Sequence, residues 1–386
     1  MDAYFQTMTA ALREAGLFKP CLVLDRDRLD ANIALTRQKL APELELRLVD
    51  KSLSCLPLLS RIANALGATR FMTFHLPISE AVLKAFPTAD LLFGKPMPVD
   101  AVRQVLSRRD DAWKRVCWLI DTQARLEQYM VMAETLGCDL RIAFEVDIGL
   151  HRGGIAEPAA LSQALQRVRQ HPLLHCEGIM GYEAHAPHIP NLFGGPEKAL
   201  AGSVAAFQAF IACLASGERQ ILNTGGSKTA LLHGAQKQAP TQANEVSIGS
   251  AFVLPSDFDT VGLTGFRPAA FIATPVLKVV EAKLPGPAFV GRVLQALGRF
   301  PRRGCYIYGG KWMAKPIFPE GAREGATLGQ SSNQQFMALP DNTKLQPDDF
   351  FFLRPTQSEF VLQQFGAIAV FSQGRIVEQW PVLPVG

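Results

Sequence analysis

A lysine stands directly after a strand-like apolar run, where it could act as a nucleophile. The run covers residues 44–50, LELRLVD, and Lys51 follows it, ahead of a helix-like segment that begins near Leu56. A lysine amine can form a Schiff base with an aldehyde or ketone, so this position is a candidate for covalent catalysis. The same lysine could be an ordinary surface charge, and the choice depends on what else the chain brings to it.

Polar and glycine-rich segments follow other apolar runs in the same way. They supply His75, Lys95, Asp121, Asp147 with His151 and Arg152, Tyr182 with His185, the stretch Thr224, Gly225, Gly226 and Ser227 in NTGGSKT, and Gly249 with Ser250 in EVSIGSAF. Glycines let backbone N–H groups approach an anion, and hydroxyl groups add donors. The two glycine-serine segments together predict a phosphate-binding cradle.

Eight apolar runs alternate with helix-like segments, and this alternation predicts how the polar residues are positioned. The runs lie at 44–50, 70–74, 90–94, 116–121, 140–147, 176–182, 220–225 and 245–252. Strand–helix alternation favours parallel strands joined by crossover helices, and eight such strands close a (β/α)8 barrel. Sites in that fold form at the carboxyl ends of the strands, so the residues named above are expected to gather there. The helix after the seventh run is the weakest, because KTALLHGAQKQAP is short and ends in proline.

The pattern changes after residue 255. The later segments resemble β-strands broken by glycine and proline, and the stretch PCLVLD at 20–25 is predicted to be a further strand of the same sheet, preceded by a helix within 1–19. The sequence therefore predicts an α/β protein with a TIM-type barrel over residues 26–255. Residues 1–25 and 256–386 are predicted to form a β-rich domain.

Composition excludes several classes of function. The formal net charge of the 386 residues is only +4, and the basic residues form no run typical of nucleic-acid binding. Seven scattered cysteines without a CxxC pair favour neither a disulfide framework nor a cysteine zinc site. The sequence contains no apolar run as long as a membrane span and no basic-then-apolar leader at its start. We expect a soluble, cytoplasmic protein whose partner is a small molecule rather than nucleic acid or a membrane.

A lysine and a phosphate cradle in one barrel indicate pyridoxal 5'-phosphate (PLP). The lysine would bind the aldehyde, the cradle would hold the phosphate, and the ring would serve as an electron sink. With these features the chain resembles the fold-type III PLP enzymes, whose barrel is that of alanine racemase. It is most similar to their D-threonine aldolase and D-serine dehydratase branch.

The resemblance depends on ordered motifs along nearly the whole chain. RLVDKS echoes the branch's Arg-Pro-His-x-Lys-Thr, EVDIGLHRGGI its acidic strand ending in Arg-x-Gly, and GIMGYEAHAP its Gly-x-x-x-Tyr, while YGGKWM and GRIVEQWPVLPVG match later motifs. The resemblance implies that Lys51 is the Schiff-base lysine, that Arg152 contacts the phenolic oxygen of the cofactor and that Tyr182 lies near its pyridine nitrogen. It also implies a homodimer, since sites in this family are shared between subunits.

The chain departs from that branch where the branch binds a divalent metal. Its Pro-x-His-x-Cys or Pro-x-His-x-Asp motif is PTQSEF here, with Gln357 in place of histidine and Glu359 at the second ligand, and SSNQQF replaces a second histidine-containing stretch. A neutral amide is a poor metal ligand, so a divalent metal is doubtful and no metal ligands are predicted. Gln335, Gln357 and Glu359 are instead candidates for binding a polar group of the substrate, and His185 with His188 is the alternative metal pair.

The predicted activity is that of a PLP-dependent lyase, either an aldolase or a dehydratase, acting on a D- or β-hydroxy amino acid. Lys51, once released from the cofactor, could serve as a general base, and His185 is the second catalytic candidate. One alternative is an amino-acid racemase or epimerase in which His185 or a partner residue acts on the opposite face of the ring. Another is a non-catalytic protein that binds PLP or an amino acid.

Several candidates also have a purely structural interpretation. Arg152 could pair with Asp147 in the same loop, Tyr182 could pack in the barrel, and Lys311 could be a surface charge. The aromatic run Phe350 to Phe352 is expected in the core or an interface rather than in a substrate site.

Overall fold

The computed structural model describes residues 2–325 and 329–384, and its contacts divide the chain into two compact units. One unit comprises Met1–Asn32, Phe252–Asp259 and Phe266–Val382, and the other comprises Ile33–Ala251, Thr260–Gly265 and Leu383–Gly386. The domain boundaries predicted from the sequence stay a prediction.

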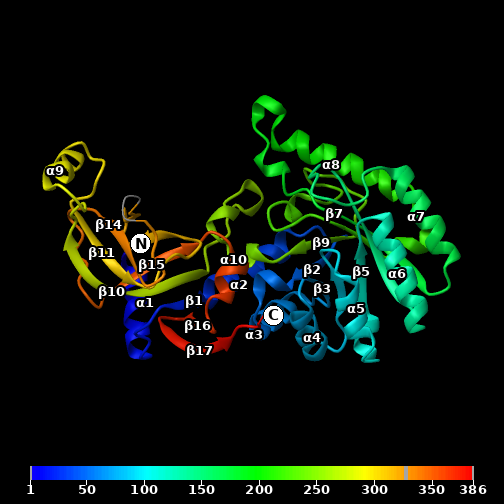
Figure 1. Ribbon diagram of the computed structural model, residues 1–386, viewed down its shortest axis with the longest axis horizontal. Coiled ribbons are helices and arrows are strands. Elements are labelled where there is room, and N and C mark those ends of the chain that lie inside the picture. The colour runs from blue at the N-terminus through cyan, green and yellow to red at the C-terminus, as the bar shows by residue number, and fades with distance from the viewer. Residues whose placement is uncertain (1, 326–328, 385–386) are drawn as a thin grey trace. The chain divides into compact units, whose positions relative to one another are not determined.

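The second unit is built on a closed eight-stranded barrel, as the strand–helix alternation predicts (Figure 1). Each strand pairs in parallel with the next, and the last pairs with the first. The strands are β2 (Glu45–Val49), β3 (Arg70–Thr73), β4 (Asp90–Phe93), β5 (Val116–Ile120), β6 (Leu140–Val146), β7 (Leu174–Gly181), β8 (Ile221–Thr224) and β9 (Glu245–Ile248). The predicted fold class, a TIM-type barrel with a β-rich domain, is confirmed.

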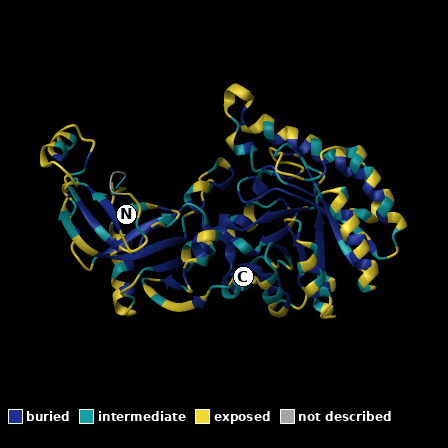
Figure 2. Cartoon of the chain, in the orientation of Figure 1, coloured by how far each residue is buried: buried dark blue, intermediate teal, exposed yellow. Residues whose placement is uncertain are grey.

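Helices follow the strands and cover the barrel with their apolar faces. They are α2 (Arg26–Lys39) ahead of the barrel, then α3 (Leu56–Leu66), α4 (Leu76–Ala85), α5 (Val99–Leu106), α6 (Gln123–Leu136), α7 (Pro158–Gln170) and α8 (Gly195–Ile211). Figure 2 shows their outer faces exposed and the strands buried. Local sequence sets the ends of α6, because the Thr122 hydroxyl accepts the Arg125 N–H and Gly137 ends the helix in the left-handed conformation. After β8 the chain forms only the short 3-10 turn η6 (Ala230–Leu232), where the sequence signal for a helix was weakest.

Charged side chains fill the amino-terminal end of the barrel. Arg47, fully buried on β2, donates to both carboxylate oxygens of Glu245 on β9, at 2.7 and 2.8 Å, and to Asp90 on β4 at 2.9 Å. Arg70 also reaches Glu245 at 2.8 Å, and Arg141 pairs with Asp90 at 2.7 Å. This network closes the end opposite the predicted site.

A β-bulge adjusts β7 to its neighbours. The pairing of β6 with β7 shifts register after Ile142, and Gly178 lies opposite the next residue. Gly178 has φ of +154°, and a Cβ there would lie 1.7 Å from the carbonyl oxygen of Ile221 on β8. Only glycine allows this close approach of the two strands.

The first unit is β-rich, and the predicted strand at 20–25 belongs to its sheet. β1 (Cys21–Asp25) pairs with β10 (Ala270–Glu281) and β16 (Ala367–Ser372). The other strands are β11 (Arg303–Tyr308), β12 (Ala314–Phe318), β13 (Arg323–Glu324), β14 (Gln334–Leu339), β15 (Phe350–Pro355) and β17 (Arg375–Pro381). The helix α1 (Asp2–Glu14) packs Phe5 against Phe271 and Phe352, and Phe350 to Phe352 are buried as expected.

Two short helices in this unit were not predicted. They are α9 (Ala288–Ala296), between β10 and β11, and α10 (Ser358–Gln363), after β15. Each spans fewer than three turns, which is too short to show a helical period in the sequence.

Candidate active site

Lys51 lies at the carboxyl end of β2, in the single turn η1 (Asp50–Leu53). Its side chain is half-buried, and its Nζ atom is 4.2 Å from the centre of the Phe74 ring, which follows β3. That ring fills the space beside Gly94, where a Cβ would lie 2.3 Å from it. The Lys51 amine therefore lies over the ring of Phe74.

The two predicted phosphate loops meet at the same end of the barrel. The Ser227 hydroxyl, after β8, accepts the backbone N–H groups of Gly249 at 3.1 Å and Ala251 at 3.2 Å, after β9. Gly249 in turn lies against the Lys51 turn, since a Cβ on it would be 2.8 Å from the Cβ atoms of both Val49 and Ser52. These contacts join Lys51's own turn to both loops, and Ser250 lies between the two donor residues.

Tyr182 lies against the first of these loops. A Cβ on Gly226 would be 2.5 Å from the edge of the Tyr182 ring and 3.1 Å from its hydroxyl oxygen. Burial raises the pKa of the Tyr182 hydroxyl above its usual value. The guanidinium of Arg152 lies 5.5 Å from the centre of this ring.

Arg152 does not pair with Asp147, so that structural interpretation was wrong. Asp147 instead accepts from the ring of His151 at 2.8 Å, while Nη2 of Arg152 lies 3.6 Å from Glu145. Burial raises the pKa of Glu145, although the charge of Arg152 acts in the opposite direction. The Arg152 side chain is exposed over the ring of Tyr182, where an anionic or phenolic oxygen of a ligand could reach it.

His185 and His188 contact different neighbours. His185 lies beside Gly149, where a Cβ would be 3.0 Å from Nε2, and its buried Nδ1 makes no hydrogen bond within the described residues. Nε2 of His188 lies 2.9 Å from Nζ of Lys228. Across residues 2–325 and 329–384, no cluster of three or more His, Cys, Asp or Glu side chains is arranged to hold a metal ion.

Glu183 is the site residue that the sequence did not reveal. It follows Tyr182 and is fully buried, and its carboxylate accepts from Thr224 Oγ1 at 3.0 Å, Gly225 N at 3.2 Å, Thr229 Oγ1 at 2.5 Å and His233 Nε2 at 3.0 Å. Burial alone would raise the pKa of Glu183, but the hydrogen bonds, led by that from His233, hold the pKa below its usual value. Nothing in GIMGYEAHAP distinguishes this glutamate from a surface one.

The internal bonds of the loop decide which donors remain for a ligand. The N–H of Gly225 donates to Glu183, and that of Gly226 donates to Thr229 at 3.1 Å. Ser227 accepts through its oxygen, which leaves its hydroxyl hydrogen for another acceptor. Gly225 and Gly226 thus allow a ligand to come close to the backbone, whereas the Ser227 hydroxyl supplies the hydrogen-bond donor for that ligand.

The three candidate substrate residues belong to the β-rich unit. Gln335 is buried on β14, and its Oε1 accepts the N–H of Lys311 at 2.5 Å, which holds the tight turn at Gly309 and Gly310. Gln357 precedes α10 and Glu359 lies in its first turn, both half-buried. Lys311 is exposed. The role of these residues toward a substrate stays a prediction.

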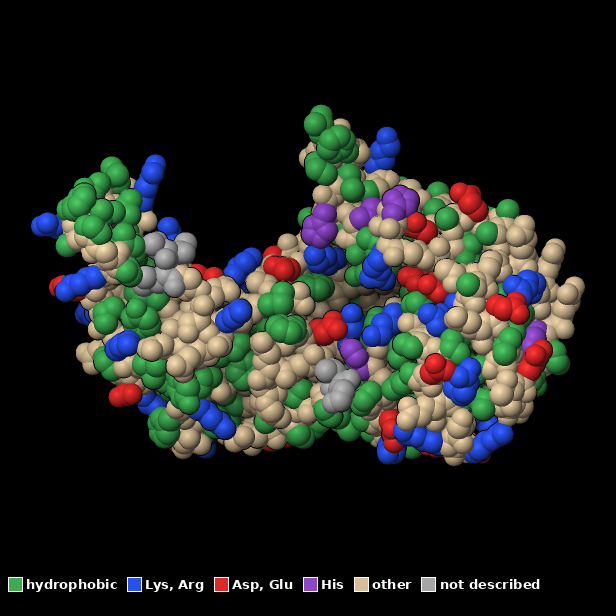
Figure 3. Space-filling view, viewed as in Figure 1, with side chains coloured by type: hydrophobic (Ala, Val, Ile, Leu, Met, Phe, Trp, Pro, Cys, Tyr) green, Lys and Arg blue, Asp and Glu red, His purple; other side chains and the backbone are tan. Residues whose placement is uncertain are grey.

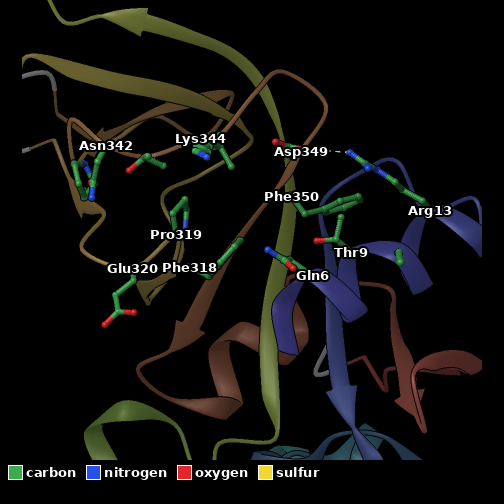
Figure 4. Close-up of a pocket in the computed structure, with 14 residues that line it drawn as sticks. Gln6, Thr9, Arg13, Phe318, Pro319, Glu320, Asn342, Lys344, Asp349 and Phe350 are labelled. Atoms are coloured by element: carbon green, nitrogen blue, oxygen red, sulfur yellow. Dashed lines mark hydrogen bonds and ion pairs between the residues drawn. The ribbon is translucent and has the colours of Figure 1, made fainter. Parts of the chain in front are cut away.

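A cavity of about 770 Å³ in the same unit has a different lining (Figure 4). Gln6, Thr9 and Arg13 of α1 line it from one side and Asn342 and Lys344 from another. Arg13 donates to Asp349 at 3.1 Å, so this cation already has an anionic partner.

The fold agrees with comparisons to known proteins. Residues 24–257 match the family model described as alanine racemase, N-terminal domain. No curated protein sequence matches the chain. Among solved structures, D-threonine aldolase from Filomicrobium marinum is 18% identical with a TM-score of 0.73, and the alignment covers 94% of each chain.

Two further structures show the same fold. D-threo-3-hydroxyaspartate dehydratase from Delftia sp. HT23 is 18% identical, with a TM-score of 0.69 over 95% of this chain and 97% of that one. Alanine racemase from Bacillus anthracis is 16% identical, with a TM-score of 0.69 over 94% and 98%. At these identities the similarity shows the fold alone, and the alignments extend over both units of the chain.

Proposed function

Because the chain belongs to the alanine racemase N-terminal domain family, we propose that it is a PLP-dependent enzyme acting on an amino acid, with Lys51 as the residue that binds the cofactor. The observation that carries the proposal is the continuous set of contacts at the carboxyl end of the barrel. It links the turn of Lys51 to Gly249, Gly249 to Ser227, and the neighbouring Gly226 to Tyr182. Tight glycine loops and a hydroxyl donor beside a lysine fit a phosphate-bearing aldehyde.

Each residue would have a distinct part. PLP, when bound, supplies an aldehyde for a Schiff base and a ring that accepts electron density from the substrate. Ser227 and Ser250 would bind the phosphate, while Thr224, Gly225, Gly226 and Gly249 would shape its loops. Arg152 would bind an oxygen of the ring and Tyr182 would support the ring from the side of Gly226. The Lys51 amine would hold and move the proton in the reaction.

For the reaction type, we propose a lyase of the aldolase or dehydratase class acting on a D- or β-hydroxy amino acid. Its support is the overall similarity to a D-threonine aldolase and to a D-threo-3-hydroxyaspartate dehydratase. By the resemblance of PTQSEF to the branch's metal motif, Gln357 and Glu359 correspond to metal ligands. We propose that these two residues, with Gln335, instead bind a polar group of the substrate without the metal.

Racemisation is the second candidate, and one observation favours it. His185, whose Nδ1 is buried without a hydrogen bond among the described residues, lies at the same end of the barrel as Lys51. A racemase needs such a second acid–base group. Non-catalytic binding of PLP or an amino acid is the third candidate.

We also propose a homodimer, supported by apolar side chains exposed on each unit. Leu192 and Phe193, between β7 and α8, are 87% and 75% exposed, and Phe289 and Leu297, at α9, are 63% and 64% exposed. Figure 3 shows hydrophobic side chains gathered at these places. Exposed apolar clusters of this kind mark association surfaces. The predicted cytoplasmic location stays a prediction; within the described chain, no helix is long and apolar enough to cross a membrane.

Visible absorption spectroscopy of the purified protein with PLP tests the proposal. We expect a band from the lysine-bound cofactor that is lost in Lys51→Ala and kept in the control Lys95→Ala, since Lys95 also follows a barrel strand but is exposed. A shift of the band with D- but not L-β-hydroxy amino acids, and product formation that is unchanged by a chelator, would support the lyase. Loss of the α-hydrogen to solvent without cleavage would support the racemase. No band in the wild-type protein would refute the cofactor assignment.

A further inference from the structure

We propose that Glu183 is a positioning residue that shapes the loop from Thr224 to Thr229 and thereby sets its affinity for a phosphate monoester. The inference rests on the proposed function, in which this loop holds the phosphate of PLP. Glu183 touches neither Lys51 nor Ser227 in the structure's hydrogen bonds, so it would act through the loop.

The carboxylate of Glu183 joins both ends of the loop. One oxygen, Oε2, accepts from the Thr224 hydroxyl and the Gly225 N–H at the beginning of the loop. The other, Oε1, accepts from the Thr229 hydroxyl near its end and from His233 beyond it. The Glu183 side chain thus connects the two ends of the loop.

Burial makes these bonds obligatory. Glu183 is completely buried, and Thr229 and His233 are 2% and 1% exposed. A buried carboxylate that loses its donors has no water to replace them, so opening the loop would leave a charge uncompensated. The loop is therefore held in one shape before any ligand arrives, which lowers the cost of ordering it on binding.

The same carboxylate also sets what the ligand would meet. Thr229, held by Glu183, accepts the N–H of Gly226, and Gly226 lies against the ring of Tyr182. Tyr182 precedes Glu183 directly in the chain. The hydroxyl oxygen of the next loop residue, Ser227, accepts hydrogen bonds from the N–H groups of Gly249 and Ala251. The position of the Ser227 hydroxyl therefore depends on an anchor that the ligand does not touch.

The test compares PLP with pyridoxal, which lacks the phosphate, in equilibrium titrations of the full-length protein. In Glu183→Gln, an amide NH2 replaces one acceptor oxygen and faces hydrogen-bond donors. We expect PLP affinity to fall at least tenfold, while pyridoxal affinity changes less than threefold. The matched control is Glu245→Gln, a buried carboxylate at the opposite end of the barrel, which should lower the melting temperature without changing the PLP-to-pyridoxal ratio.

A second pair of variants protects the test against misfolding of Glu183→Gln. Thr229→Val removes one hydroxyl that bonds to Glu183, whereas Thr229→Ser keeps it, so the phosphate-specific loss should appear in the first and be rescued in the second. Equal losses for PLP and pyridoxal, or no loss, would overturn the proposal and leave Glu183 a purely structural residue.

Binding of inorganic phosphate separates this inference from the proposed function. If the wild-type protein binds no PLP but does bind phosphate, and Glu183→Gln weakens that binding tenfold, the cofactor assignment fails and the loop inference stands. If it binds neither PLP nor phosphate, both are refuted.

Discussion

Replacing Arg47 by methionine should destabilise the barrel without touching the candidate site. The guanidinium is fully buried and donates to both oxygens of Glu245, to a carboxylate oxygen of Asp90 and to the carbonyl oxygens of Phe71 and Asp90. Methionine fills part of the same volume but supplies no donor. Glu245 would keep its bonds to Arg70 and Asn223, at 2.8 and 2.9 Å, and lose two.

Removing one partner of a buried ion pair typically costs about 3–5 kcal/mol, because the other charge is left uncompensated. A domain of 150–250 residues loses about 2–4 °C of melting temperature for each kcal/mol. We therefore expect Arg47→Met to lower the barrel's melting temperature by about 6–20 °C. Differential scanning calorimetry of the wild-type and variant proteins measures this directly.

The matched control is Arg103→Met, which removes an arginine paired with Asp100 on the exposed surface of α5. Exposed pairs contribute little, so this variant should change the melting temperature by less than about 2 °C. A shift of less than about 2 °C in Arg47→Met as well would refute the argument that the network stabilises the barrel. It would mean that the cost of burying these charges cancels their attraction.

Three further outcomes are expected. Gly178→Ala should prevent soluble folding or strongly lower the melting temperature, because a Cβ there would lie 1.7 Å from the carbonyl oxygen of Ile221. The control Gly202→Ala, on α8 with open space around it, should be neutral or slightly stabilising. The yield of soluble protein and calorimetry check both variants. Burial would raise the pKa of Glu245, but Arg47 holds that pKa below its usual value. The ionised Glu245 carboxylate therefore stabilises the folded state fully above about pH 4.3, the unfolded-state pKa of glutamate. This stabilisation is lost as the pH falls through the lower folded-state pKa. Melting temperatures between about pH 5 and pH 3 should therefore fall more steeply in the wild type than in Arg47→Met; parallel slopes would contradict this. Ser227→Ala should weaken PLP binding more than pyridoxal binding in equilibrium titrations, because the variant lacks the hydroxyl proposed to bind the phosphate.

The barrel could be predicted because its signal is repeated. The parallel strands are mostly buried, so they appear as apolar runs, and most of them are followed by a segment with helical spacing. The polar residue after each run could then be assigned to the carboxyl end without any knowledge of side-chain geometry. This is how Lys51, Tyr182 and Ser227 were selected, and the structure places all three at that end.

The partners of these residues could not be predicted, because they depend on contacts between distant segments. Asp147 has both His151 and Arg152 within reach along the chain, and only the path of the loop decides that His151 takes it. Gln335 carries a side chain suited to a substrate, yet its amide oxygen is used by the N–H of Lys311 across a turn. Neither outcome leaves a trace in local spacing.

Buried charges are the largest gap in what the sequence conveys. Arg47 interrupts an apolar run, and Glu183 directly follows one. A charged residue is ordinarily expected at the protein surface. Each is tolerated because partners on other strands or loops supply hydrogen bonds that replace water. At the amino-terminal end such a network closes the barrel, and at the carboxyl end it shapes a loop. The two ends thus use the same physical device, so a variant series that separates stability from phosphate binding would show which charges serve the fold and which serve the site.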